Sequence, residues 1–294
     1  MRPVTTKRDD KAGFTIIELL TVMSVIIILI GLLVPALNMV KRFAKRVSQK
    51  NQFHAIEVGL ETFNAEWDGY PPSDPTNAGG GSPLYCGAMK LAEALVGQDL
   101  QGFHPGARFV WPDILLYQAS DVDRSARRKY VKPQSANVKR LGDIFPERVG
   151  SSLMGDMLVV CDVYTQNWTN PQTGESIGMP VLYYRADPTK RGHSQAEADS
   201  GQSIYDYRDN DALVQLGMPF EQPPPSGPAH LMDSRGLPTM HRPPLDRSSA
   251  QVFYDKTWNS SAGEPYNSDT YILLSAGFDG EYGTDDDVFN FIRK

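Results

Sequence analysis

A long block of apolar side chains lies near the start of the chain. No charged residue occurs from Leu19 to Val40. At about 1.5 Å of rise per residue, a helix over this block would be roughly 33 Å long, enough to cross a hydrocarbon core of about 30 Å. One carboxylate, Glu18, lies at the edge of the block. Because an isolated charge in lipid costs several kcal/mol, Glu18 needs a partner.

Beyond Lys41 the apolar residues become periodic. They recur every three or four residues, as in the buried stripe of an amphipathic helix, at Val40, Phe43, Ala44, Val47, Phe53, Ile56, Leu60, Phe63 and Trp67. The opposite face is expected to carry Lys45, Arg46, Gln49, Lys50, Glu57 and Glu61. The pattern predicts one helix from about Thr15 to Trp67, roughly 80 Å long, which ends where Gly69 and Pro71 interrupt it.

The remaining pattern predicts a head of mixed structure. A short helix is expected over Ala88–Val96, with Lys90 and Glu93 as its polar positions. Three apolar stretches are strand candidates, and the first two are expected to form a hairpin: Met157–Val163, Pro180–Arg185 and Thr270–Ser275. A small antiparallel sheet packed on the long helix makes the predicted class α+β. Residues 187–265 are polar and rich in proline, and are expected to form a large loop-rich insertion.

Composition and charge argue against a nucleic-acid-binding protein and against a zinc site. The net charge of −6 offers no basic footprint for nucleic acid. A local basic cluster at 124–132 is interleaved with aspartates, which favours a solvated face. Cys86 and Cys161 belong to no CxxC pattern, so a zinc site is not indicated. The sequence leaves open whether they form a disulfide or remain two buried thiols.

Two ordinary explanations of the apolar block fit incompletely. A cleaved secretory signal would account for the basic residues before it, but the block is longer than the usual apolar region of about 7–15 residues and no A-x-A site follows. A plain membrane anchor fits the length but gives no reason for Glu18. Basic residues flank the block on both sides, so they do not decide its orientation.

A third explanation rests on a motif. Gly13, Phe14 and Glu18 are spaced at the junction of charged and apolar sequence in Lys11-Ala12-Gly13-Phe14-Thr15-Ile16-Ile17-Glu18-Leu19-Leu20. This segment resembles the prepilin N-terminus that type IV pilins share with the pseudopilins of type II secretion. The resemblance implies that a prepilin peptidase cuts after Gly13 and methylates Phe14, the new N-terminal residue.

The same resemblance implies a division of the chain. It predicts a leader at 1–13, a transmembrane and polymerisation half of the helix at 14–40, an amphipathic half at 41–67 and a globular head at 68–294. The segment Phe63–Pro71 is similar to the turn after the long helix in major pseudopilins. The insertion at 187–265 is a departure from those shorter chains, and it leaves open whether this is a major or a minor subunit.

Glu18 also gains a partner through the resemblance. After cleavage Phe14 would carry a cationic amine, and Glu18 of one subunit would pair with the amine of a neighbour in the filament. Coulomb attraction is strong at low dielectric, but desolvation offsets much of it. The pair is therefore expected to act mainly as a registry device for assembly.

The strongest polar cluster lies near the C-terminus. Four aspartates and a glutamate occupy a glycine-broken loop after the third strand candidate, within an acidic segment at 275–290. Calcium takes six to eight oxygen ligands on such loops. The spacing is not that of an EF-hand, but it is similar to the C-terminal calcium loop of major pseudopilins. That resemblance implies structural Ca²⁺, with carbonyls near Ala276 and Thr284 assisting Asp279, Asp286, Asp287 and, as a further candidate, Asp285. The alternative is a solvated acidic turn.

No catalytic residue is predicted. The sequence contains no H-E-x-x-H pair, no G-x-S-x-G elbow and no G-x-x-x-x-G-K-[ST] loop. Carboxylate pairs such as Asp209 and Asp211 are expected to be exposed loop residues.

The expected function is mechanical. The chain is predicted to be a single-pass protein of the bacterial inner membrane with its head in the periplasm, a pilin-like subunit of a type II secretion pseudopilus. Its expected partners are the prepilin peptidase, other pseudopilin subunits and the inner-membrane secretion platform, with no nucleic acid. The alternatives are a type IV pilus subunit for adhesion, motility or DNA uptake, and a membrane-anchored binding or enzymatic domain that uses a pilin-type anchor.

Overall fold

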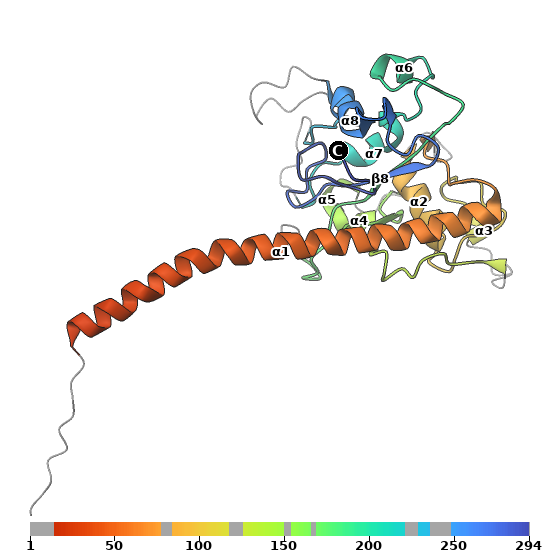
Figure 1. Cartoon of the computed structure of the whole chain (residues 1–294). Helices are drawn as coiled ribbons and strands as arrows, with labels where there is room; N and C mark the ends of the chain where they lie inside the picture. The colour runs from red at the N-terminus through yellow and green to blue at the C-terminus, as the bar shows by residue number, and fades with distance from the viewer. Residues whose placement is uncertain are drawn as a thin grey trace, which may run out of the picture. The chain divides into compact units, whose positions relative to one another are not determined.

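The computed structural model describes residues 15–77, 84–117, 126–149, 154–165, 169–220, 229–235 and 248–293. It contains two compact units, Met1–Ala44 and Lys45–Lys294. Its elements are a long N-terminal helix, short helices and small antiparallel sheets (Figure 1). The predicted α+β class is confirmed.

Helix α1 (Ile16–Trp67) is continuous over 52 residues, which confirms the helix predicted from the apolar pattern. Every large apolar side chain from Ile16 to Val40 is at least 41% exposed. Within the described part of the chain, α1 is the helix that is long and apolar enough to cross a membrane.

The second part of α1 supplies one side of the head's core. Phe53, Ile56, Leu60 and Phe63 are buried, as the periodicity predicted. Each large apolar side chain buried in this way contributes about 1.5–3 kcal/mol. The stripe does not extend to the earlier positions, because Phe43 and Val47 are exposed.

Two glutamines join this buried face, and for Gln49 this corrects the prediction of an exposed position. Gln52 Nε2 donates to the carbonyls of Ala136 at 3.0 Å and Cys161 at 2.8 Å. Gln49 donates to the Gln52 side chain and accepts from the Val163 N–H at 2.9 Å. These amides bond to backbone groups of the head, so this part of α1 is fixed to the head by directed bonds as well as by apolar contact.

The principal sheet has three antiparallel strands in the order β5 (Leu182–Arg185), β8 (Tyr271–Ser275) and β9 (Val288–Phe289). Leu182 pairs with Leu274, and Ser275 pairs with Val288. The second and third strand candidates are therefore confirmed as strands, and they pair with each other.

The expected hairpin between the first two candidates is confirmed only as a short antiparallel contact, Cys161 with Pro180. The regular strand pairing of β4 (Leu158–Val160) is with β3 (Val138–Arg140). The contact with the second candidate lies at the end of β4, where the Val181 N–H donates to the Val160 carbonyl at 2.7 Å and the Asp162 N–H donates to the Met179 carbonyl at 2.8 Å. The sequence between 140 and 158 gives no strong hairpin signal, so the pairing of β3 could not be read from its own residues.

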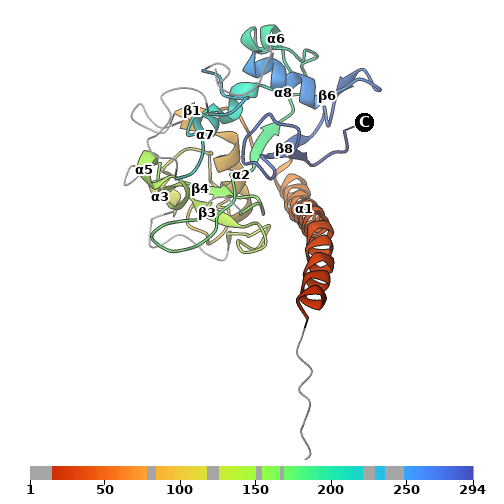
Figure 2. The same cartoon turned by 90° about the vertical axis from the view of Figure 1, so that its left-hand side faces the viewer.

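Helix α2 (Gly87–Val96) is buried on every side and packs against β4 and β5 (Figure 2). The predicted helix is confirmed, but Lys90 and Glu93 are each only 1% exposed. Lys90 Nζ donates to the Asp74 carbonyl at 2.5 Å, and Tyr85 Oη donates to Glu93 at 2.9 Å. The predicted helix is therefore a core helix, and its two polar side chains have hydrogen-bond partners inside the protein.

The remaining elements are short and connect these layers. They are β1 (Thr76–Asn77), β2 (Leu84–Tyr85), α3 (Ile114–Tyr117), α4 (Leu141–Ile144), α5 (Pro146–Val149), α6 (Gln195–Asp199), the 3₁₀ helix η2 (Tyr207–Asn210), α7 (Asp211–Val214), α8 (Ser249–Thr257), β6 (Trp258–Asn259) and β7 (Glu264–Pro265).

The inserted segment 187–265 contains more structure than its composition predicts. Its described residues form helices α6, η2, α7 and α8 and the β6–β7 ribbon. Tyr205, Leu213 and Phe253 from this segment are buried in the main core. The proline runs at 223–225 and 243–244 lie outside the described residues. The insertion is thus part of the head's core.

Cys86 and Cys161 are two separate buried thiols in this structure. Burial raises the pKa of the Cys86 thiol to about 12. A thiol held in its neutral form is a weak nucleophile, so neither cysteine has the environment of a reactive thiolate.

Glu93 makes the stability of the head depend on pH. Burial raises the pKa of its carboxyl from 4.5 to about 7, against hydrogen bonds that include one from Tyr85. The folded state therefore binds this proton more tightly than the unfolded chain, and the associated stability is present below about pH 4.5 and is lost as pH rises through about 7. The free energy of unfolding of the wild type should therefore fall between about pH 5 and about pH 8. In Glu93→Gln that fall should be smaller by on the order of 2–3 kcal/mol.

Urea unfolding of the full chain in detergent at a series of pH values measures this difference. Glu264→Gln, at an exposed position, is the matched control and should retain the wild-type pH slope. A Glu93→Gln slope equal to that of the wild type would contradict the prediction.

Candidate functional site

The predicted processing residues Gly13 and Phe14 lie outside the described residues. Glu18, the predicted assembly residue, is exposed in the first turn of α1. Its carboxylate accepts from the Thr15 N–H at 2.9 Å and from the Thr15 hydroxyl at 2.7 Å, and Thr15 Oγ1 accepts from the Glu18 N–H at 3.3 Å. This reciprocal arrangement is a capping box.

The capping box was not predicted, although the T-x-x-E spacing of Thr15 and Glu18 is its sequence signal. It gives Glu18 a partner within its own chain. The carboxylate is thereby held at the start of the helix, where the helix dipole also favours a negative charge. The same residue is available to a cation from outside, because its side chain is exposed.

The acidic loop connects β8 to β9, between Ser275 and Asp287. Gly277, Gly280 and Gly283 have positive φ angles of 72°, 75° and 102°. A Cβ added to Gly277 would lie 2.3 Å from the Asp286 carbonyl oxygen, so only glycine allows the loop to close there.

The start of this loop is held by a buried carboxyl that the sequence analysis did not single out. Asp162 accepts from the Ser275 hydroxyl at 2.8 Å and from the N–H groups of Tyr164 and Met179 at 3.1 Å each. It therefore connects the end of β4, the approach to β5 and the end of β8. Burial raises the pKa of Asp162 to about 7, with those hydrogen bonds opposing the shift. A lone aspartate within the apolar run 157–163 was the available signal.

Asp286 organises the middle of the loop. Its carboxylate accepts from the N–H groups of Phe278 at 2.6 Å and Asp279 at 3.0 Å, and from the Thr284 hydroxyl at 2.6 Å. Partial burial works against the charge, but the hydrogen bonds from Thr284, Asp279 and Phe278 leave the pKa of Asp286 lowered. The side chain is thus a structural acceptor that bends the loop back on itself.

Asp279 lies beside Asp286, and Asp285 is exposed. Burial, and to a lesser extent the neighbouring Asp286 charge, raise the pKa of Asp279 to about 6, against the hydrogen bond from the Glu281 N–H. Two adjacent carboxyl groups disfavour double ionisation unless a proton or another cation accompanies them.

Asp287 occupies a different environment. Its side chain is fully buried, and its carboxylate accepts from the Gly283 N–H and lies 3.4 Å from Lys256 Nζ. Lys256 also donates to the Thr284 carbonyl. The four predicted metal ligands therefore separate into an adjacent pair, an exposed residue and a residue that faces an ammonium group.

This arrangement differs from the expected calcium site. Two of the oxygens that would serve calcium, on Asp287 and Thr284, face the same lysine. In the described part of the chain, no group of three or more histidine, cysteine, aspartate or glutamate side chains is grouped as a metal site would need. The donor set as arranged does not fit a calcium ion held by all four aspartates. The predicted calcium ion and the lysine are thus alternative partners for the Asp287 and Thr284 oxygens.

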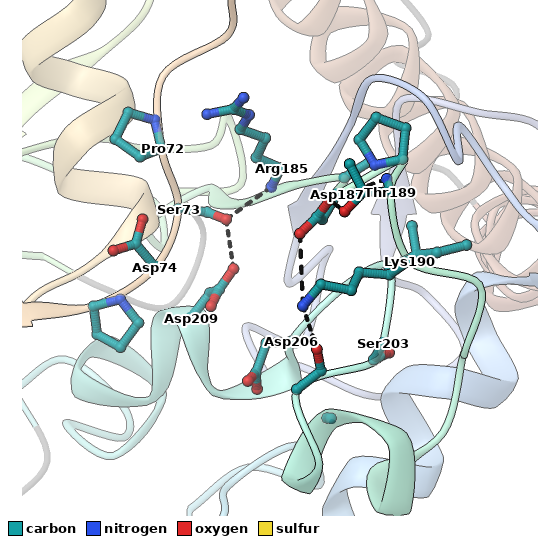
Figure 3. A pocket seen from close by; sticks show the side chains of 16 residues that line it. Pro72, Ser73, Asp74, Arg185, Asp187, Thr189, Lys190, Ser203, Asp206 and Asp209 are labelled. Carbon is teal, nitrogen blue, oxygen red and sulfur yellow. Dashed lines mark hydrogen bonds and ion pairs between the residues drawn. The ribbon is translucent and has the colours of Figure 1, made fainter.

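A cavity with a volume of about 550 Å³ lies elsewhere in the head (Figure 3). At its wall Ser73 donates to Asp209 at 2.5 Å and accepts from the Arg185 N–H at 2.9 Å. On the other side Lys190 lies 3.7 Å from Asp187 and donates to the Gly201 carbonyl. The charged groups of this wall are thus largely satisfied within the protein.

Asp209 corrects the expectation of an exposed loop carboxylate, because it is only 5% exposed. Burial raises its pKa to about 8, although the hydrogen bond from Ser73 opposes the shift. Asp211 is half-buried, and burial raises its pKa to about 6. No histidine is among the described residues that line the cavity.

Comparisons with protein-family models, with curated proteins and with solved structures found no match to this chain. What supports a function is thus the geometry of α1, of its first turn and of the acidic loop.

Asp286 and Asp285 provide a matched test of the loop. Asp286→Ala removes three hydrogen-bond acceptor contacts, so we expect the free energy of unfolding to fall by about 1–3 kcal/mol. Asp285→Ala changes the net charge equally at an exposed position and should stay within about 0.5 kcal/mol of the wild type. Chemical denaturation of both variants measures the difference. Equal effects of the two substitutions would show that charge, and not hydrogen bonding, explains the role of Asp286.

Proposed function

We propose that this chain is a pilin-like structural subunit of a type II secretion pseudopilus. Residues 14–40 would hold the precursor in the bacterial inner membrane with the head in the periplasm, and α1 would later form the core of the filament. The prepilin peptidase would remove residues 1–13. The other partners would be further pseudopilin subunits and the inner-membrane secretion platform.

The observation that carries the proposal is the character of α1. One uninterrupted helix carries an apolar run with every large side chain exposed and, further along, a face buried in the head. A simple anchor needs no such connection, since a flexible linker would serve. A subunit that transmits force from the core of a filament to its head needs one continuous helix that packs in the filament core and in the head.

Apolar packing permits such helices to assemble but does not fix their register. The exposed isoleucine, leucine and valine side chains of residues 16–40 are costly in water but are satisfied equally by lipid tails or by neighbouring helices. Because lipid already covers this surface, apolar contact alone gives little preference for one register over another. A polar contact is needed to specify the position of each subunit.

Glu18 is suited to that role. It is the only charged residue between Thr15 and Val40, and its side chain is exposed at the start of the helix. A cleaved neighbour would present the cationic amine of Phe14 at the same depth. An unpaired charge in lipid is strongly unfavourable, so pairing would favour the register that brings these two groups together.

Substitution of Glu18 tests this function. We expect Glu18→Ala to be cleaved and methylated normally but to enter filaments at least tenfold less than the wild type, because it leaves the amine of the neighbour unpaired. Mass spectrometry of the mature chain measures processing, and the amount of subunit in sheared or cross-linked filaments measures assembly.

Two controls isolate the proposed role. Thr15→Val disrupts the capping box while keeping the carboxylate of Glu18, and should assemble. Ser24→Ala removes a hydroxyl that bonds only within the helix, to the Thr21 carbonyl, and should behave as the wild type. Normal incorporation of Glu18→Ala, or a defect in Thr15→Val of the same size, would contradict the pairing.

A further inference from the structure

The inserted segment places a lysine against the acidic loop. Lys256 is near the C-terminal end of α8, and the residue is only 7% exposed. Its Nζ donates to the Thr284 carbonyl and lies 3.4 Å from a carboxylate oxygen of Asp287, whose side chain is fully buried. Removal of one partner of such a buried ion pair strongly destabilises the folded protein, because the other charge is left buried without a counter-charge.

The two oxygens that face Lys256 are of the type that hard metal cations bind. A backbone carbonyl and an aspartate carboxylate are ordinary calcium ligands, and calcium requires six to eight such oxygens. An ammonium group satisfies the same oxygens with a single charge and three N–H donors. At this side of the loop the cation is therefore the ammonium group of Lys256, which belongs to the chain itself.

The insertion also holds the loop at other points. The Tyr282 N–H donates to His230 Nδ1 at 3.2 Å, and the Met232 N–H donates to the Tyr282 carbonyl at 3.3 Å. A Cβ added to Gly283 would lie 2.8 Å from Leu231 and 3.1 Å from Val252. Both described parts of the insertion near the loop, 229–235 and α8, thus pack closely on it.

We infer that Lys256 is a built-in cation that takes the place of a metal ion at Asp287 and Thr284, so that the inserted segment closes the acidic loop without calcium. The inference concerns the stability of the head and is independent of whether the chain assembles into a pseudopilus. It also gives the inserted segment a role, because α8 of that segment supplies the ammonium group.

Thermal unfolding of the full chain in detergent tests the inference, measured in excess calcium chloride and in excess EGTA. The wild-type midpoint should differ by less than about 2 °C between the two conditions. Lys256→Met, which keeps most of the side-chain volume, should unfold about 5–15 °C lower than the wild type in EGTA. Lys139→Met is the matched control, because its partner Glu175 is largely exposed, and it should shift by less than about 3 °C.

Two further variants separate the charge pair from packing. Lys256→Arg keeps the cation and should retain most of the wild-type unfolding midpoint. This variant still tests the inference if Lys256→Met fails to fold. The double variant Lys256→Met with Asp287→Asn removes both charges and should recover part of the loss. A wild-type midpoint that rises by more than about 5 °C in calcium would overturn the inference. A Lys256→Met midpoint within about 3 °C of the wild type, or a double variant that recovers nothing, would overturn it as well.

Discussion

The apolar surface of residues 16–40 is the constraint on which the whole molecule depends. Every large apolar side chain in this range is at least 41% exposed within the chain itself. Covering one such side chain is worth about 1.5–3 kcal/mol, so the surface has to be placed in lipid or against other helices. The head then has to stay attached to a helix whose surroundings change. Phe53, Ile56 and Leu60 meet this need by apolar burial, and Gln49 and Gln52 add hydrogen bonds that fix the helix to the head.

The spacing of apolar residues predicted those elements whose positions depend on local sequence. The extent of α1, the position of α2 and two strands of the principal sheet followed from the spacing of apolar residues. Contacts between distant segments did not follow from it. Gln49 and Glu93 look like surface residues in sequence, but both are buried. Gln49 accepts from the Val163 N–H, 114 residues away, and Glu93 accepts from the Tyr85 hydroxyl on the preceding strand β2. The pairing of β3 with β4 also depends on tertiary contact.

The acidic loop was likewise predictable in part from local sequence and in part not. The positions of Asp279, Asp285, Asp286 and Asp287 in one loop were predicted from sequence, together with the glycines that let the loop turn. Their different environments were not predictable, because Lys256 comes from a helix in the inserted segment and no local pattern connects it to Asp287. Residues 187–265 looked like an appended loop, yet they contribute core residues and a cation to the head.

On the proposed function, α1 becomes a polymerisation helix once a leader has been removed from it. Mass spectrometry of the N-terminus of the protein, extracted from the membrane of a bacterium that expresses it, tests this proposal. We expect a mature chain that begins at Phe14 with a methylated amine. A chain that retains an intact Met1 would contradict it, because the amine that Glu18 is proposed to pair with would then not exist.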